Sequence, residues 1–222
     1  MDKTERRKLL GLPSYTLGEE LTNSISHGLG AAFGIVALVL CVVFGARQGD
    51  AWKVVSGAIY GASMIVLYSI STIYHALGIN RAKKVFRTLD HCSIYFLIAG
   101  TYTPYTLVAM RESSGFLVFA VVWTAAVLGI VLNAINVHRF RVVSMILYIA
   151  MGWAIVFSAR DLIAAVPPVG VTLLISGGVL YTIGAVLYGI GKTKKYMHSV
   201  FHFLALGGSV CHFISVFAYV LL

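Results

Sequence analysis

Two histidines four residues apart open the last apolar stretch of the chain, in the segment His198-Ser-Val-Phe-His202. Side chains at i and i+4 share one face of a helix and are separated by about 6 Å along its axis. Two imidazoles placed in this way can bind the same metal ion at about 2.0–2.1 Å each. A third ligand from another helix would complete the three protein ligands of a catalytic zinc site, which keeps one position open.

His75 is the best candidate for this third ligand. It closes another apolar stretch and follows Ser71 by four residues, so the serine hydroxyl shares its helical face. Asp90 opens the next apolar stretch. Ionisable groups at the ends of apolar segments are costly and mark functional sites. We therefore predict a metal held by these histidines, with Ser71 and Asp90 beside it as catalytic residues.

The other four histidines fit less specific roles. His27 and His91 also lie at the ends of apolar stretches. Each either orients a ligand or the bound water, or forms an interfacial hydrogen bond, and the sequence leaves both open. His138 lies in a basic connection and is predicted to be solvated. His212 lies ten residues past His202, about 15 Å deeper, and is predicted to be a buried, hydrogen-bonded histidine.

Long apolar stretches must position these residues. The chain has 222 residues, of which 59% are hydrophobic and 11% are charged, whereas a soluble domain has about 25% charged residues. About 20 residues cross a bilayer as a helix. The sequence therefore predicts an all-α integral membrane protein, a single seven-helix domain over residues 1–222. Seven stretches reach the required length: 28–46, 54–77, 92–110, 115–135, 142–159, 169–190 and 196–222.

The basic residues predict the orientation of the bundle. The N-terminal tail and the connections 78–89, 136–141 and 191–195 hold 13 Lys and Arg, whereas the other connections hold 4. Basic residues mark the cytoplasmic side of short loops. The N-terminus, with residues 1–20 as a cytoplasmic segment, is thus predicted inside the cell and the C-terminus outside. The net charge of +9 then binds membrane lipid headgroups and requires no nucleic acid.

Prolines predict two irregularities. Pro104 follows Thr103 inside the third stretch, so we expect a kink there. The pair Pro167-Pro168 cannot continue a helix and predicts a turn between the fifth and sixth helices. The connection at this turn is expected over residues 160–168.

Five motifs together resemble one known family. They are Glu19-x-x-x-Asn23, Ser24-x-x-His27, Ser71-x-x-x-His75, Leu89-Asp90 and His198-x-x-x-His202. In this order they resemble the hemolysin III family, which is related to the progestin and adipoQ receptors, including the adiponectin receptors. The resemblance implies a seven-helix bundle with its N-terminus inside and a zinc ion on His75, His198 and His202. It also implies that Asp90 contacts the water at the zinc and that Ser71 lies beside it, with Glu19, Asn23, His27 and His91 as the surrounding shell.

Three functions are compatible with these patterns. The preferred one is a zinc-dependent hydrolase of lipid amide or ester bonds in the cell membrane, involved in lipid homeostasis. The alternative is a membrane sensor or receptor-like protein in which zinc joins helices structurally. The third is a pore-forming hemolysin, although a pore needs a polar stripe through the whole membrane depth. The ionisable groups cluster instead at one end, with His212 as the exception.

Overall fold

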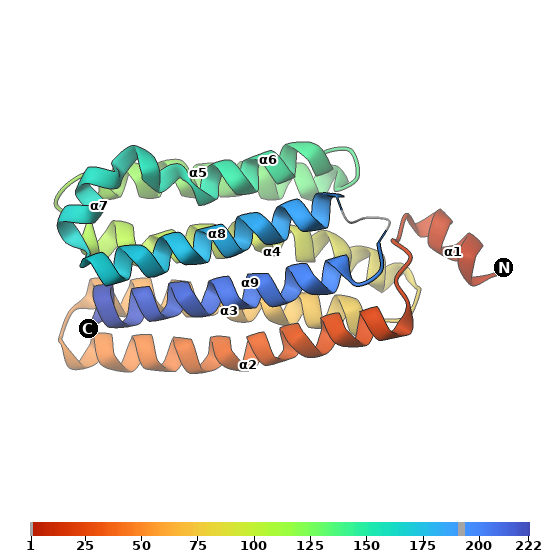
Figure 1. Ribbon diagram of the computed structural model, residues 1–222, viewed down its shortest axis with the longest axis horizontal. Helices are drawn as coiled ribbons and strands as arrows, with labels where there is room; N and C mark the ends of the chain where they lie inside the picture. Colours follow the sequence, from red (N-terminus) through yellow and green to blue (C-terminus); the bar gives the residue numbers. More distant parts are fainter. Residues whose placement is uncertain (1, 191–193) are drawn as a thin grey trace.

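The described part of the chain is a bundle of helices without strands (Figure 1). The computed structural model describes residues 2–190 and 194–222, so the predicted basic residue Lys192 lies outside the described residues. The short helix α1 projects from one end of the bundle, and the C-terminus lies at the other (Figure 1). The elements are α1 (Lys3–Leu10), α2 (Leu17–Arg47), α3 (Ala51–Ala76), α4 (Arg81–Pro104), η1 (Tyr105–Ala109), α5 (Gly115–Asn136), α6 (Arg141–Gly152), η2 (Ala154–Ser158), α7 (Ala159–Ala165), α8 (Pro168–Ile190), α9 (Met197–Val216) and η3 (Phe217–Leu221).

Six helical runs in the described residues are long and apolar enough to cross a membrane: α2, α3, α5, the run Arg141–Ala165, α8 and α9. This confirms the prediction of an all-α, multi-pass membrane protein. Helix α4 is equally long and packs between α3 and α5. However, its first ten residues include five charged ones. The count of seven spans, the single domain and the orientation of the termini stay predictions.

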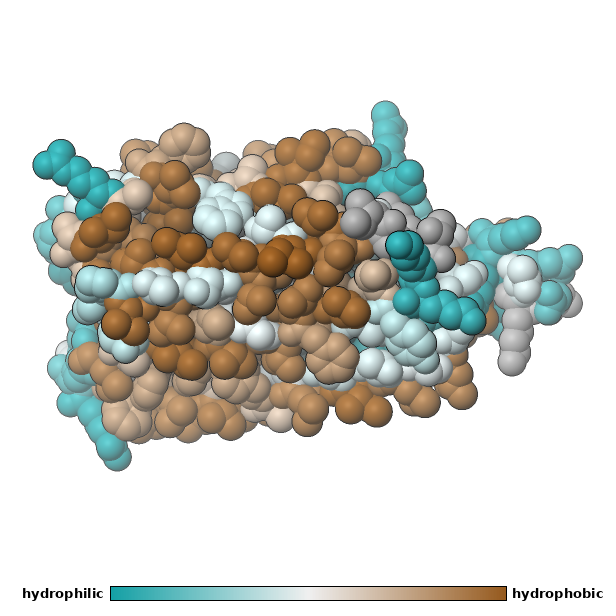
Figure 2. Space-filling model, in the orientation of Figure 1, coloured by the Kyte–Doolittle hydropathy of each residue, from teal (hydrophilic) through white to brown (hydrophobic). Residues whose placement is uncertain are grey.

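The outer surface of the bundle suits a lipid environment. Large apolar side chains face outward along the bundle, and the Phe157 side chain is 94% exposed. Figure 2 shows apolar residues over most of the visible face and hydrophilic residues gathered at both ends. Water would not tolerate so much exposed apolar surface on a monomer. The helices are therefore solvated by acyl chains along their length and by headgroups at their ends.

The N-terminal helix of the bundle begins earlier than the apolar stretch 28–46. Helix α2 starts at Leu17, where the Thr16 side chain accepts a hydrogen bond from the Glu19 backbone and the Glu19 carboxylate accepts one from the Thr16 backbone. This capping box satisfies backbone N–H groups that a helix start leaves unpaired. Because the box fixes the start, the polar first turns of α2 continue directly into the membrane-spanning part.

The two predicted proline effects have different outcomes. Helix α8 begins at Pro168, which confirms the predicted turn. At the other site, α4 ends at Pro104 and continues as the π-helical turn η1. This irregular turn directly follows a residue that has no backbone N–H, and the kink itself stays a prediction. The hydroxyl of Thr103 donates to the Ala99 carbonyl at 2.9 Å, one turn back in the helix.

The predicted connection over residues 160–168 is wrong for most of its length. Helix α7 occupies Ala159–Ala165, so the chain stays helical past two charged residues, Arg160 and Asp161. The Asp161 carboxylate accepts a hydrogen bond from the Ser114 backbone at 3.1 Å. The Asp161 charge therefore lies near the start of α5, where it binds backbone instead of ending the helix.

Close approach of α2 and α3 depends on glycine. A Cβ atom added to Gly61 would lie 2.5 Å from Leu38 Cα, and one added to Gly57 would lie 2.7 Å from Cys41 Cβ. Small residues at such contacts let two helix backbones approach, which favours packing within a bilayer.

We expect the Gly61→Ala variant to unfold more readily, because its new methyl group collides with backbone that cannot rotate away. Overpacking of this kind costs about 1–3 kcal/mol. Gly189→Ala is the matched control, because a Cβ at Gly189 meets nothing within 4 Å. Thermal unfolding in detergent measures both variants. Equal midpoints for the two would contradict the close approach of α2 and α3.

Candidate metal centre

Three imidazole nitrogens converge at the end of the bundle that carries α1. His198 Nε2 lies 3.2 Å from His75 Nε2 and 3.1 Å from His202 Nε2. The three side chains could hold one metal ion. Nitrogens bound to a tetrahedral zinc at 2.0–2.1 Å lie about 3.3 Å apart, which is close to the observed spacing. The structure thus brings together the three predicted ligands from α3 and α9.

The partners of the opposite ring nitrogens fix the tautomers. His75 Nδ1 lies 2.8 Å from the Glu20 carboxylate, and His202 Nδ1 lies 3.3 Å from the Asn23 backbone carbonyl. Both partners are acceptors, so each Nδ1 carries the hydrogen and each Nε2 presents a lone pair. Two lone pairs therefore face His198 Nε2, and a cation between the three nitrogens would bind all of them at once. The donor set therefore fits a divalent metal such as zinc.

Glu20 is a site residue that the sequence reasoning missed. Its carboxylate contacts His75 Nδ1 and also lies 2.8 Å from Lys83 Nζ. Lys83 is only 3% exposed and donates a second hydrogen bond to the Leu77 carbonyl. The lysine thereby compensates the glutamate charge while the glutamate orients the histidine. A carboxylate–histidine pair of this kind raises the basicity of a metal ligand.

The structure places Glu19, which the motif suggested, away from the histidines. Its carboxylate accepts hydrogen bonds from the Thr16 and Tyr196 backbone N–H groups, each at 2.8 Å. Glu19 thus connects the start of α2 to the residue before α9. Asn23 is fully buried, and its side-chain oxygen accepts a hydrogen bond from Ser199 at 2.6 Å. Asn23 therefore holds α9 against α2 beside the metal ligands.

Two further rings stack on the metal ligands. The His27 ring stacks on His202 with centroids 3.5 Å apart, and neither of its nitrogens has a hydrogen-bond partner among the described residues. The Tyr15 ring, from the segment before α2, stacks on His198 with centroids 5.0 Å apart. Tyr15 was not singled out from the sequence, because nothing in its neighbourhood marks it as part of a site.

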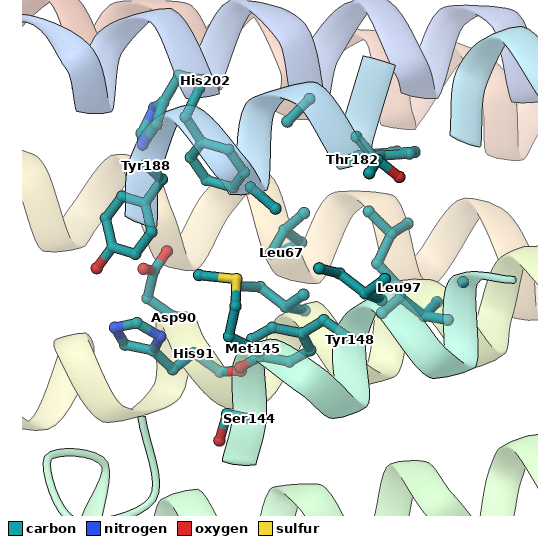
Figure 3. Close-up of a pocket in the computed structure, with 18 of the residues that line it drawn as sticks. Leu67, Asp90, His91, Leu97, Ser144, Met145, Tyr148, Thr182, Tyr188 and His202 are labelled. Carbon is teal, nitrogen blue, oxygen red and sulfur yellow. The ribbon is translucent and has the colours of Figure 1, made fainter. Parts of the chain in front are cut away.

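Asp90 approaches the same site from α4. Its carboxylate interacts electrostatically with His75 and with Ser71, although the Ser71 hydroxyl forms no hydrogen bond at ordinary distances. It is not one of the side chains that could hold the metal directly. In Figure 3, Asp90 and His91 from α4 share a pocket with His202 from α9. The His91 backbone carbonyl accepts a hydrogen bond from the Tyr148 hydroxyl at 2.7 Å.

A large cavity continues from the histidines into the bundle. Its volume is about 720 Å³, within the roughly 300–1,000 Å³ of small-molecule sites. The walls come from α3, α4, α6, α8 and α9, together with the segment between α1 and α2. The lining includes His198, His202 and Asp90 at one end and apolar side chains such as Leu97, Leu162 and Leu174 farther in.

The remaining two histidines line the same cavity but lie apart from the three metal ligands. His212 is buried and its Nε2 lies 3.0 Å from the Leu174 carbonyl, which confirms the predicted hydrogen-bonded role. His138 is exposed, as predicted, but its Nε2 lies 2.5 Å from Arg87 Nη1. The same Arg87 nitrogen donates to the Gly11 carbonyl at 2.6 Å. Arg87 therefore fixes the end of α1 to the bundle beside the cavity.

Comparison with known proteins places the chain in a family. A family model described as "Haemolysin-III related" matches residues 15–213, which include every residue of the histidine cluster. The chain belongs to the haemolysin III family. It is 39% identical to the "Hemolysin-3 homolog" of Bacillus subtilis (strain 168) over 205 residues, or 92% of this chain and 96% of the relative. The "Hemolysin-3" of Bacillus cereus is 39% identical over 203 residues, or 91% and 92% of the two chains.

A more distant relative is eukaryotic. The human "Monocyte to macrophage differentiation factor" is 24% identical over 213 residues, which cover 92% of this chain and 85% of the relative. The similarity of this haemolysin III family member to that protein extends over nearly the whole bundle. It agrees with the expected relationship to the progestin and adipoQ receptors.

Adjacent glutamates provide a sharp test of the metal centre. We expect Glu20→Gln to weaken Zn²⁺ binding about 10–100-fold, the usual effect of losing a carboxylate behind a histidine ligand. Glu19→Gln should bind Zn²⁺ as the parent does, because its carboxylate contacts only backbone N–H groups and the Thr16 side chain. Competition with a chromophoric chelator measures both affinities. His202→Ala should lose binding altogether, and retention of parental affinity in that variant would contradict the assigned ligands.

The pKa of His138 provides a test of the Arg87 contact. Burial lowers the pKa of His138 below its usual 6.5, and the charge of Arg87 lowers it further. The folded protein therefore binds a proton less readily than the unfolded chain. The contact keeps its full stabilising effect above about pH 6.5 and loses it as the pH falls below that value. NMR titration of the imidazole should show this lowered pKa and its rise in Arg87→Gln, whereas equal values would contradict the contact.

Proposed function

We propose that this protein is a zinc-dependent hydrolase of lipid amide or ester bonds within the membrane. One observation carries the proposal: three imidazole nitrogens converge beside Asp90 at the polar end of a cavity whose interior is apolar. A lipid in this cavity would have its acyl chain among apolar side chains and its carbonyl group at the histidines. A metal that only joined helices would require no cavity of this size next to it.

Zinc bound at this site would polarise a carbonyl group and make an attacking water more acidic, with a pKa near ~7. His75, His198 and His202 would hold it, with the basicity of His75 raised by Glu20. Asp90 faces the site without belonging to the metal-holding group. It is therefore placed to accept a proton from the attacking water and to return it to the leaving group.

Ser71 and His27 supply polar groups on the cavity wall. The Ser71 hydroxyl is buried and interacts with the Asp90 carboxylate, so it would lie beside the reacting group and could donate to an oxyanion that develops on the substrate. His27 stacks on His202 and restricts the rotation of that ligand. Tyr15 covers His198 from the side of α1 and limits the entry of bulk water, which strengthens electrostatic interactions in the site.

The test is fatty acid release by the purified protein in liposomes, with N-acyl and O-acyl lipids as substrates. We expect zinc-loaded protein to release fatty acid and Asp90→Asn to be slower by about 10²–10⁴-fold, the usual contribution of an acid–base group. Asp161→Asn, at the far end of the bundle, is the matched control and should keep its activity. Both variants should bind zinc with parental affinity.

Two results would contradict the proposal. One is zinc-loaded protein that releases no fatty acid from either lipid class at any pH. The other is a thermal unfolding midpoint that depends on zinc equally in the parent and in Asp90→Asn, while neither protein releases fatty acid. That second result would support a structural metal that joins α3 to α9, as in a membrane sensor.

A further inference from the structure

Four basic side chains line the cavity near the end that holds the metal ligands. They come from α4, from the start of α6 and from the segment before α9. Arg141, Lys194 and Lys195 are exposed and Arg87 is half-buried, so this part of the cavity communicates with the solvent. We call Arg87, Arg141, Lys194 and Lys195 the basic mouth.

Three tyrosine rings contact the histidines and also interact with the basic mouth. Tyr15, Tyr74 and Tyr188 line the same cavity, and all three interact electrostatically with Arg87. Tyr188 also interacts with Arg141. Protonated phenols and guanidinium groups are hydrogen-bond donors that suit phosphate oxygens.

Membrane orientation does not account for this arrangement. Arg81 and Arg139 lie in the same two connections as Arg87 and Arg141, and both are exposed. They would orient the chain equally well, yet neither lines the cavity. The cavity wall is thus enriched in cations beyond what topology requires. Its two acidic lining residues in the described part of the chain are Glu19, which binds backbone N–H groups, and Asp90.

The basic mouth is close enough to the metal ligands for one molecule to contact both. Arg87 interacts electrostatically with His198 and with Asp90. A headgroup phosphate at Arg87 and Arg141 would therefore leave the neighbouring acyl carbonyl near the histidines and the acyl chain in the apolar interior. The carboxylates of Glu19 and Asp90 offset only part of the four positive charges of the basic mouth, and a neutral headgroup would add no further anion.

We propose that the basic mouth binds the phosphate of a lipid headgroup, so that the substrate is a phosphate-bearing acyl lipid. Calling this lipid a substrate rests on the proposed hydrolase function, whereas binding of phosphate at the basic mouth does not depend on turnover. In the reaction, water gives its OH to the acyl carbon and a hydrogen to the leaving oxygen or nitrogen as the acyl C–O or C–N bond breaks. The products are a fatty acid and the phosphate-bearing headgroup.

The experiment measures lipid binding by the full-length protein in detergent, without added metal, by native mass spectrometry. The probes are oleoyl lysophosphatidate, neutral monooleoylglycerol and glycerol 3-phosphate, which has the phosphate but no chain. We expect lysophosphatidate to bind at least tenfold more tightly than monooleoylglycerol. Arg141→Gln should remove most of this preference, and Arg139→Gln, in the same connection, should keep it.

Arg87 needs a conservative variant because it also holds Gly11. Arg87→Lys keeps the charge but loses the guanidinium fork, so we expect a weaker preference for lysophosphatidate with parental zinc affinity. Parental zinc affinity in each variant shows that the bundle has folded.

Three outcomes would overturn the phosphate site. They are equal affinity for the two lipids, equal losses in Arg139→Gln and Arg141→Gln, and binding of glycerol 3-phosphate as tight as that of lysophosphatidate. The last result would indicate a site for free phosphate instead of a lipid. Fatty acid release is measured separately. Selective binding without release from either lipid would contradict the hydrolase and support the phosphate site.

Discussion

The convergence of three imidazole nitrogens, from buried His75 and His202 and half-buried His198, is the constraint around which this end of the bundle is organised. Such an arrangement is unfavourable in a low-dielectric interior unless a cation binds or protons rearrange. Glu20 and the Asn23 carbonyl occupy the Nδ1 atoms of His75 and His202, so a hydrogen between the three nitrogens must come from His198 Nε2. The surrounding helices therefore hold the histidines in a state prepared for a metal ion.

The Glu20 carboxylate gives this state its electrostatic balance. A buried carboxylate is costly without a compensating charge, and Lys83 supplies that charge from the start of α4. Glu20 of α2 consequently contacts both His75 of α3 and Lys83 of α4, and so links the three helices at the depth of the metal ligands. Lys83 contributes to the count of basic residues that predicts orientation, but in the folded chain it is part of the site. A single residue can thus serve membrane topology and site geometry together.

Polar and apolar functions are separated along the axis of the bundle. The end near α1 gathers imidazoles, carboxylates, phenols and cations, whereas the cavity farther in is lined mainly by aliphatic side chains. A lipid has the same separation between headgroup and chain. The segment from Gly11 to Thr16 closes part of the polar end, held by Arg87 on one side and by Glu19 and Tyr196 on the other. Access to the site therefore depends on contacts between this segment and the first turns of α2 and α4.

The sequence by itself determined the membrane class, the helical fold and the three histidines that meet. Each depends on local information: apolar length sets a spanning helix, and spacing of four residues sets a shared helical face. The choice between Glu19 and Glu20 was not available locally, because both lie on the turns of α2 that lead to Asn23. Only the rotation of α2 against α3 brings one carboxylate to His75 and leaves the other to backbone N–H groups.

The same reason limits what the sequence could show of Tyr15, Arg87 and the cavity. These features depend on contacts between segments far apart in the chain, such as Tyr15 with His198 and Arg87 with Gly11. Helix α7 shows that local signals can also mislead. Arg160 and Asp161 suggested a connection, yet both lie in a helix, and the Asp161 carboxylate accepts a hydrogen bond from the Ser114 backbone. Hydropathy and spacing act along one segment, whereas burial, pairing and cavity shape are decided by packing between segments.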